Sequence, residues 1–177
     1  MRKLNFELPI VKDYPKPGIN FIDINPLLQN PAQYCAVVDA FCEAIKAAGV
    51  DATKTAIITP ESRGFIFGAP AAYRLNLPLV LIRKEGKVPH RPYPFPITNE
   101  YSSYNMEVDE DLLNNFSRFI YVDDILASGQ TLASVRRALK AKGKEIVLAL
   151  HLTDVTDLKQ MRDNNADLRG LPLEIIL

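Results

Sequence analysis

The stretch that decides the fold reads Phe119-Ile-Tyr-Val-Asp-Asp-Ile-Leu-Ala-Ser-Gly-Gln-Thr131. Its first four residues form an apolar run that predicts a buried strand, with Asp123 and Asp124 at its carboxyl end. A turn of mainly small residues follows, and residues 129–142 then predict a helix that ends before Gly143. This order of strand, acidic pair, turn and helix indicates an α/β protein whose ligand site lies at the end of the strand.

The turn after this strand has the properties of a phosphate-binding site. The first backbone N–H groups of a helix have no partner within the helix, and the positive end of the helix dipole lies behind them. Small side chains allow a phosphate to approach, and the paired carboxylates can accept hydrogen bonds from the vicinal hydroxyls of a ribose. The residues that we predict to form this ribose-phosphate site are Asp123, Asp124, Ala127, Ser128, Gly129, Gln130 and Thr131.

Strand and helix patterns alternate on both sides of this stretch. One helix is predicted between its N-cap Asn30 and Gly49, and another over residues 63–75. Short apolar runs predict further strands at residues 55–59, 77–83 and 145–150. We therefore expect an α/β fold with a central, mainly parallel sheet and flanking helices, in a single domain that spans residues 1–177.

Two more polar motifs follow predicted strands. Glu61-Ser-Arg-Gly64 comes after the first strand, and Arg83-Lys-Glu-Gly-Lys87 comes after the second. Because the carboxyl ends of parallel strands meet at one edge of a sheet, we expect both motifs to lie near the acidic pair. They would concentrate cations at this edge, namely Arg63, Arg83, Lys84, Lys87 and Arg91.

The segment over residues 84–104 contains prolines at positions 89, 92, 94 and 96. Proline lacks the N–H donor, so this segment can form neither a helix nor a central strand. A segment of this length without regular structure is typically a functional lid or a disordered loop. We expect a long flexible lid loop here.

The composition excludes some classes of protein. The chain has 177 residues with 21 basic and 21 acidic side chains, so its formal net charge is zero. A nucleic-acid or membrane surface usually carries a basic excess, so an anionic ligand has to be bound by a local cluster of cations. No signal peptide or membrane-spanning run is evident, and Cys35 and Cys42 are spaced too far apart on one helix for a disulfide. These features predict a cytoplasmic protein without nucleic-acid or membrane partners.

The run over residues 119–131 resembles the motif with which type I phosphoribosyltransferases bind phosphoribosyl pyrophosphate (PRPP). Three further blocks, residues 13–28, 61–70 and 83–89, together with Glu100-Tyr101, resemble the adenine branch of this family. The resemblance extends in order from about residue 13 to about residue 155. It implies the type I phosphoribosyltransferase fold and a purine phosphoribosyltransferase that converts adenine and PRPP to AMP and pyrophosphate. It also implies a homodimer and dependence on Mg²⁺, which would be held mainly through PRPP without a dedicated metal site in the protein.

The resemblance also implies roles for individual residues. Asp123 and Asp124 would bind the ribose hydroxyls, and residues 127–131 the 5′-phosphate. Glu100 would be catalytic and handle the proton of the purine. The pyrophosphate would be bound by Ser62, Arg63, Arg83 and Lys87, in part across the dimer interface. The base-binding residues would be Asn20, Phe21, Ile22 and Ile125, with the rings of the base between Phe21 and Ile125.

Several residues depart from the family pattern. Gln130 and Ser102 stand where glycine is common, and Asn20 and Ile22 replace residues that are usually apolar and basic. The amide of Asn20 has donor and acceptor faces that could serve a 6-oxopurine such as hypoxanthine, guanine or xanthine. A non-catalytic PRPP-sensing domain is the other alternative, although Glu100, Arg63 and Lys87 are all present. The two histidines carry little weight, since His90 lies in the expected lid and His151 ends a predicted strand.

Overall fold

A computed structural model describes residues 4, 6–98 and 103–177 of the chain. Its main sheet has seven strands in the order β5-β6-β4-β3-β7-β8-β9, and a separate hairpin pairs β1 with β2. The five strands from β4 to β9 in this order run parallel, and β5 and β6 are antiparallel at one edge. The expected mainly parallel sheet is confirmed. The strand bounds are β1 Ile10–Val11, β2 Phe21–Ile22, β3 Thr55–Pro60, β4 Leu79–Lys84, β5 Pro92–Thr98, β6 Ser103–Asp109, β7 Arg118–Leu126, β8 Glu145–Asp154 and β9 Leu173–Ile175.

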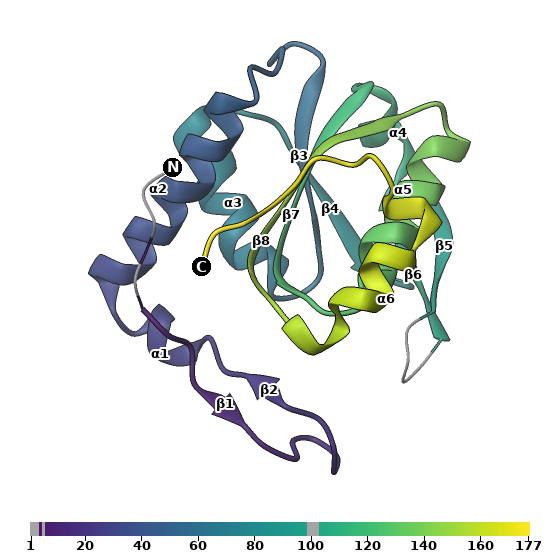
Figure 1. Cartoon of the computed structure of the whole chain (residues 1–177). Coiled ribbons are helices and arrows are strands. Elements are labelled where there is room, and N and C mark those ends of the chain that lie inside the picture. The colour runs from purple at the N-terminus through teal and green to yellow at the C-terminus, as the bar shows by residue number, and fades with distance from the viewer. Residues whose placement is uncertain (1–3, 5, 99–102) are drawn as a thin grey trace.

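Helices cover both faces of the sheet (Figure 1). The helices α2 (Pro31–Ala47) and α3 (Gly64–Leu75) lie on one face, and α5 (Gln130–Ala141) and α6 (Lys159–Asn164) lie on the other. The β1–β2 hairpin projects below the sheet, on the side where the chain leaves β7 for α5 (Figure 1). The shorter elements are α1 Asn25–Leu28, α4 Glu110–Asn114 and the 3₁₀ turns η1 Thr156–Leu158 and η2 Ala166–Leu168.

The helix ends follow the signals in the sequence. The side chain of Asn30 accepts a hydrogen bond from the backbone N–H of Gln33, and Pro31 begins α2. Gly49, with a φ of +60°, follows that helix, and Gly143, with a φ of +68°, follows α5. A left-handed residue after the last turn satisfies helix carbonyls at little steric cost when it is glycine. The predicted helices are therefore confirmed to within a residue or two at each end.

Strand β7 is longer than the sequence predicts. It continues through both aspartates to Leu126, because β8 pairs with it as far as the Leu126↔Asp154 position. Ile120 and Val122 pack into the core beneath α2 and α3, whereas Tyr121 packs into the core beneath α5. This alternation places the two adjacent aspartates on opposite faces of the strand.

Within the proline-rich segment β5 and β6 form a hairpin, so the expectation that residues 84–104 lack regular structure is wrong, while a role as a lid stays a prediction. Prolines 92, 94 and 96 recur with period two on β5, which lies at the edge of the sheet. Alternate residues of an edge strand turn their N–H groups away from the partner strand, so these prolines cost no ladder hydrogen bond. Phe95, between two of the prolines, and Ile97, after the last of them, are buried in the core.

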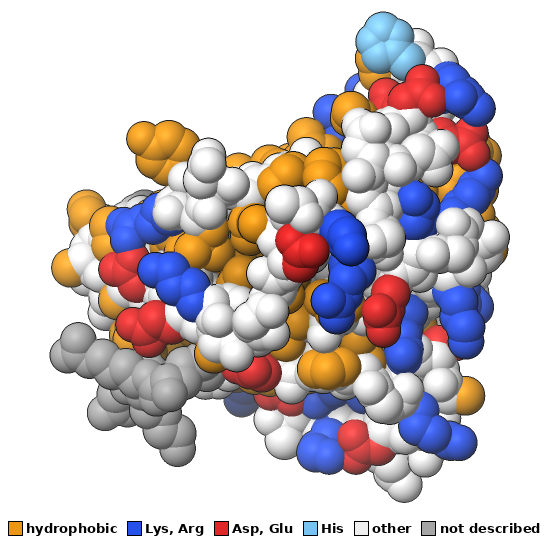
Figure 2. Space-filling model, turned by 90° about the horizontal axis from the view of Figure 1, so that it is seen from above, with side chains coloured by type: hydrophobic (Ala, Val, Ile, Leu, Met, Phe, Trp, Pro, Cys, Tyr) orange, Lys and Arg blue, Asp and Glu red, His pale blue; other side chains and the backbone are white. Residues whose placement is uncertain are grey.

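The charge distribution on the surface and the state of the two cysteines are as the sequence predicts. Acidic and basic side chains intermingle on the face of the molecule seen from above in Figure 2. Cys35 is exposed and Cys42 is buried, and neither forms a disulfide. In the part of the chain that the structure describes, no helix combines the length and the apolar character that a membrane span requires.

Candidate functional site

The carboxyl ends of β3, β4 and β7 meet at one edge of the sheet. These three strands are parallel neighbours, with Ile57 of β3 opposite Leu79 of β4 and Ile120 of β7. The three motifs that follow or end these strands therefore converge, as the sequence predicts. A cavity of about 240 Å³ lies between the first and the third of them, lined by Pro60, Glu61, Ser62, Arg63, Tyr104, Met106, Asp123, Asp124 and Thr131.

Residues 127–131, which we call the phosphate turn, curve around a second cavity of about 130 Å³. Gly129 has a φ of +80° and directly precedes α5, whose first helical hydrogen bond runs from Ala133 N to the Gly129 carbonyl at 2.9 Å. The N–H groups before Ala133 are thus free of intrahelical partners. Gly129 takes the left-handed conformation, so Gln130 can begin the helix, and it also lines the cavity of the turn.

The acidic pair has an asymmetric environment. The Tyr121 hydroxyl donates a hydrogen bond to Asp123 Oδ2 at 2.8 Å, and the Asp124 N–H donates to Asp123 Oδ1 at 2.9 Å. Asp124 Oδ2 lies 2.6 Å from Arg63 Nε. Burial, and then the charge of Asp124, raises the pKa of Asp123 well above its usual range. Asp123 therefore holds its proton more tightly than an exposed aspartate, whereas Asp124 has a cationic partner.

Arg63 connects the acidic pair to the β1–β2 hairpin. While its Nε binds Asp124, its guanidinium carbon lies 5.2 Å from the centroid of the Phe21 ring. Tyr14 packs edge-on against the same ring at 5.3 Å. Arg63 thus lies against the aromatic ring that the sequence predicts to stack on a purine.

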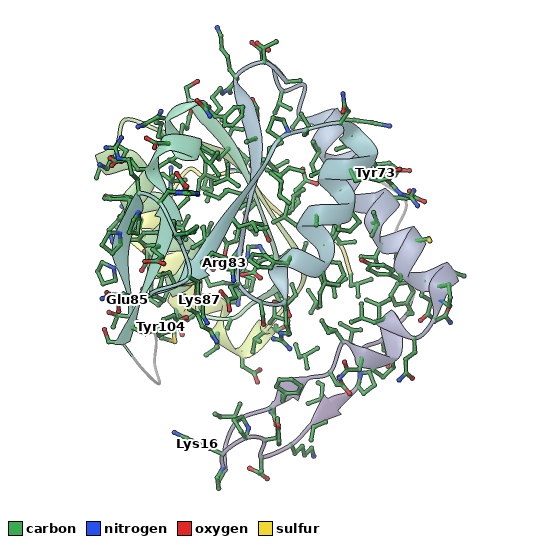
Figure 3. The ribbon with its side chains drawn as sticks, turned by 180° about the vertical axis from the view of Figure 1, so that it is seen from behind. Lys16, Tyr73, Arg83, Glu85, Lys87 and Tyr104 are labelled. Atoms are coloured by element: carbon green, nitrogen blue, oxygen red, sulfur yellow. The ribbon has the colours of Figure 1, made fainter. Side chains whose placement is uncertain are left out.

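A second group of contacts orders the motif after β4. Glu61 Oε2 accepts hydrogen bonds from Lys84 N at 3.1 Å and Arg83 Nε at 3.0 Å, and these lower the pKa of Glu61. Buried Glu107 of β6 accepts from the backbone N–H groups of Lys87 and Val88 at 2.7 and 2.6 Å. The Lys87 side chain is exposed, and Figure 3 shows it at the same end of the β5–β6 hairpin as Glu85 and Tyr104.

Arg91 does not belong to this cation cluster, so that part of the sequence prediction is wrong. Its guanidinium pairs with Asp111 at 2.7 Å and with Glu110 at 3.1 Å, next to α4. In the hairpin register, Pro92 lies opposite Asp109, at the far end from the Thr98↔Ser103 pair. An extended hairpin carries Arg91 away from the edge, whereas a loop could have brought it back.

Tyr104 is a site residue that the sequence reasoning missed. It lines the 240 Å³ cavity as well as an adjoining cavity of about 840 Å³ formed with Lys84, Glu85, Ser103 and Asn105. Burial is the main cause that raises the pKa of its phenol, which the hydrogen bond to Thr131 partly offsets. Glu107 and Tyr121 were also missed. The contacts of Tyr104 and Glu107 are to residues distant in sequence, which no local pattern indicates. Tyr121 lies two residues before Asp123 on the same face of the strand, so the strand period of two could have indicated that contact.

The remaining predicted residues are placed in different ways. Ile125 lines the small cavity of the phosphate turn. Asn20, Phe21 and Ile22 lie in or next to β2, away from the core, and their role as a base site stays a prediction.

Glu100 lies outside the described residues, as do Tyr101 and Ser102. His151 is buried in β8, where burial lowers its pKa to about 3 and keeps it neutral, and it lines the small cavity of the phosphate turn. His90 is exposed.

Comparison with known proteins is consistent with this arrangement. The sequence profile of the phosphoribosyl transferase domain matches residues 23–170. The adenine phosphoribosyltransferase of Carboxydothermus hydrogenoformans is 36% identical over 159 residues, which are 90% of this chain and 89% of that protein. The enzyme of the same name from Roseiflexus castenholzii is 39% identical over 149 residues, 84% of each chain.

Solved structures agree in fold. The crystal structure of adenine phosphoribosyltransferase from Thermoanaerobacter pseudethanolicus superposes with a TM-score of 0.81 at 30% identity, covering 96% of this chain and 94% of that one. The Saccharomyces cerevisiae enzyme, crystallised with an imino-altritol bisphosphate and adenine, gives a TM-score of 0.81 at 27% identity, covering 96% and 94%. With the strand–acidic pair–turn–helix site in place and most of its length matched, the chain belongs to the phosphoribosyltransferase family, alongside the adenine phosphoribosyltransferases.

Proposed function

We propose that this chain transfers the phosphoribosyl group of PRPP to adenine, forming AMP and releasing pyrophosphate. The observation that supports this best is the 240 Å³ cavity in which Asp123, Asp124, Arg63 and Thr131 meet. It combines acceptors for ribose hydroxyls with a cation and the open end of a helix. We take adenine as the base because the relatives of this chain are adenine phosphoribosyltransferases.

Binding of PRPP would use the two cavities together, since both are lined by Asp123 and Thr131. The 5′-phosphate would accept hydrogen bonds from the free N–H groups of the phosphate turn and from the hydroxyls of Ser128 and Thr131. The carboxylates of Asp123 and Asp124 would accept from the ribose hydroxyls. Ligand binding would favour the ionised form of Asp123, against the effect of burial.

The pyrophosphate would bind on the other side of the ribose, beside Ser62 and Arg63. Arg63 would then exchange part of its contact with Asp124 for the pyrophosphate oxygens. The same movement would free the Phe21 ring, which Arg63 faces at 5.2 Å, for stacking with the base. We therefore expect PRPP to bind before adenine.

In the reaction, N9 of adenine forms a bond to C1′ of the ribose while the bond from C1′ to the pyrophosphate oxygen breaks. The bonding electrons leave with the pyrophosphate, and the purine loses one proton. Glu100 would manage that proton, as the family resemblance implies. Positive charge develops on the ribose ring at C1′, so water must be excluded from the site during transfer.

Mg²⁺ fits the chemistry of this site. It prefers oxygen ligands and keeps several waters, and the carboxylates of Asp123 and Asp124 lie in the cavity that the ribose and pyrophosphate would share. When bound with PRPP, the ion would neutralise charge on the leaving pyrophosphate. Most of its ligands would come from the substrate.

A homodimer in the cytoplasm is part of the same proposal. Arg83 is tied to Glu61 of its own chain through Nε, with its guanidinium carbon 5.9 Å from the Phe65 ring. One third of its side chain is exposed, which leaves the outer guanidinium N–H groups able to reach a neighbouring subunit's pyrophosphate. The free thiols suit a reducing compartment. Sedimentation that gives a fully active monomer would contradict the dimer.

The deciding experiment is a panel of bases assayed with PRPP and Mg²⁺ for pyrophosphate release. We expect kcat/KM for adenine to exceed that for hypoxanthine, guanine and xanthine. Backbone acceptors near Phe21 that face the 6-amino group would be left unpaired by a 6-oxo base, at a cost of about 1–3 kcal/mol. A 6-oxopurine that outperforms adenine about tenfold would overturn the choice of base, and Asn20→Val would then show whether the exposed Asn20 amide is the cause.

A further inference from the structure

Arg162 approaches the phosphate turn from behind. It lies on α6 and is 8% exposed, although it is a charged residue. Its Nη1 donates hydrogen bonds to the carbonyl of Ala127 at 2.7 Å, of Val155 at 2.7 Å and of Leu126 at 3.3 Å. Its Nη2 pairs with Asp154. One guanidinium thus contacts two consecutive carbonyls at the point where β7 enters the turn.

We infer that Arg162 is a positioning residue for binding of the 5′-phosphate, and this inference rests on the proposed function. In a planar trans peptide, the C=O and the N–H point in opposite directions. The Leu126 carbonyl shares its peptide with the Ala127 N–H, and the Ala127 carbonyl shares its peptide with the Ser128 N–H. By holding the Ala127 carbonyl on its own side, Arg162 turns the Ser128 N–H toward the opposite side. The Leu126 carbonyl also accepts from the Val155 N–H at 2.9 Å, so there Arg162 only adds to a bond between β7 and the end of β8.

That opposite side is the cavity where the phosphate would lie. Ala127 and Ser128 both line the 130 Å³ cavity of the turn, and Arg162 does not. Arg162 instead lines a separate cavity of about 450 Å³ on the other side of Leu126. The Ser128 N–H thus depends for its direction on a side chain that does not line the ligand cavity.

Packing around Gly129 supports the same role. A Cβ at Gly129 would lie 2.6 Å from Leu168 Cδ1 and 3.5 Å from Arg162 Cγ. The segment from α6 to η2 therefore presses directly on the turn. If residue 162 served packing alone, an apolar side chain there would fill the space without the cost of burying a charge. The guanidinium is suited to directing several carbonyls at once.

The test compares Arg162→Met with a matched control, Arg136→Met. Arg136 also donates to two backbone carbonyls, those of Asp167 at 2.5 Å and Arg169 at 3.2 Å, but these lie in or next to η2. We expect Arg162→Met to raise the KM for PRPP and the dissociation constant for ribose 5-phosphate by about tenfold. The KM for adenine should change less than about threefold. Arg136→Met should lower Tm by a similar amount and leave affinity for both phosphorylated ligands unchanged.

A second variant separates loss of ligand affinity from loss of protein stability. Arg162→Ala opens space that adjoins the 450 Å³ cavity, so added guanidinium at millimolar concentration can enter. We expect guanidinium to restore ribose 5-phosphate affinity in Arg162→Ala, and urea to have no such effect. A lack of rescue, or equal loss of affinity in Arg136→Met, would show that Arg162 acts only through stability and would overturn the inference.

Ribose 5-phosphate binding, measured by calorimetry, separates this inference from the proposed function. A wild-type protein that binds ribose 5-phosphate but transfers nothing to any base would contradict the proposed function and leave the inference standing. An active wild-type enzyme whose Arg162→Met variant keeps normal affinity would contradict only the inference. A wild-type protein that does not bind ribose 5-phosphate would contradict both.

Discussion

The phosphate turn and the β1–β2 hairpin differ in how they are stabilised, although we expect them to bind the two substrates of one reaction, PRPP and the base. The acidic pair lies at the end of β7 and the phosphate turn leads from it into α5, with Asp124 and Ser128 only 5% and 3% exposed. The hairpin has two residues in each strand, and its Ile10 and Val11 are 60% and 43% exposed. A two-stranded ribbon of this length has little stability of its own.

This difference indicates that recognition of PRPP and recognition of the base are divided between the two regions. The groups that would recognise PRPP are fixed by the core of the domain, so their geometry is determined wherever the fold forms. Most of the groups that would recognise the base lie on the β1–β2 hairpin, which is outside the core. The structure therefore predicts that PRPP affinity and base affinity respond to different substitutions.

The largest effect is expected for the acidic pair itself. Asp123→Asn combined with Asp124→Asn keeps the shape and removes the charge that would accept the ribose hydroxyls and assist Mg²⁺. We expect kcat/KM for PRPP to fall at least about tenfold, equivalent to about 1.4 kcal/mol. Asp39→Asn, on the exposed surface of α2, is the matched control. Near-normal activity of the double variant would remove the basis of the proposed function.

A smaller effect is expected for substitutions of the two glycines of α3 that pack closely against Thr59. A Cβ at Gly64 would lie 2.7 Å from Thr59 Oγ1 and 3.0 Å from Asp123 Oδ1. At Gly68 the tight contacts are all to Thr59. Gly64→Ala and Gly68→Ala should both lower the free energy of unfolding, by about 1–3 kcal/mol.

Only the first of these two variants should also weaken PRPP binding, because only its new methyl group displaces Asp123. Urea denaturation gives the stability of each variant, and steady-state kinetics gives the KM for PRPP. Equal weakening of PRPP binding in both variants would mean that general loosening of the core, and not the position of Asp123, sets the affinity.

On the hairpin, Phe21→Ala tests the other half of the comparison. Loss of stacking on the base should raise the KM for adenine by about 5- to 150-fold, since base–aromatic stacking contributes about 1–3 kcal/mol. The KM for PRPP and the melting temperature should change little, because the hairpin contributes little to the core. Tyr14→Ala, which removes only the edge-on neighbour of Phe21, serves as the control. If PRPP affinity falls as much as adenine affinity, the division into two independent halves is wrong.

The smallest expected effect is a change in stability with pH. The raised pKa of Asp123 means that the folded state binds its proton more tightly than the unfolded state does. Its contribution therefore disfavours folding increasingly as the pH rises from the unfolded pKa through the folded one. Without ligand, Asp123→Asn should melt at a higher temperature than wild type, and the difference should be larger at about pH 8 than at about pH 5.

Thermal melting of both proteins at the two pH values checks this prediction, with Asp39→Asn as a control for general charge effects. A difference in melting temperature that does not depend on pH would show that the buried carboxylate carries no such cost. The same variant should bind PRPP more weakly, so stability and function would change in opposite directions at one residue.

The sequence by itself determined the elements near the site and their order. The apolar run before Asp123, the glycines at 49, 129 and 143, and the Asn30-Pro31 start of α2 act through neighbouring residues. Periodicity, capping and turn chemistry are local, so they can be recognised without knowing which strands pair. The alternation of these elements was sufficient to predict a mainly parallel sheet with polar motifs at one edge.

Only the tertiary structure decided how far β7 extends, that the proline-rich segment is an edge hairpin, and that Arg91 pairs with α4. It alone placed Tyr104 beside Thr131 and Arg162 behind the phosphate turn. Each of these depends on contacts between residues distant in sequence, such as the 35 positions that separate Arg162 from Ala127. Strand register and the packing of α6 fix those contacts, and a local pattern of residues carries no information about either.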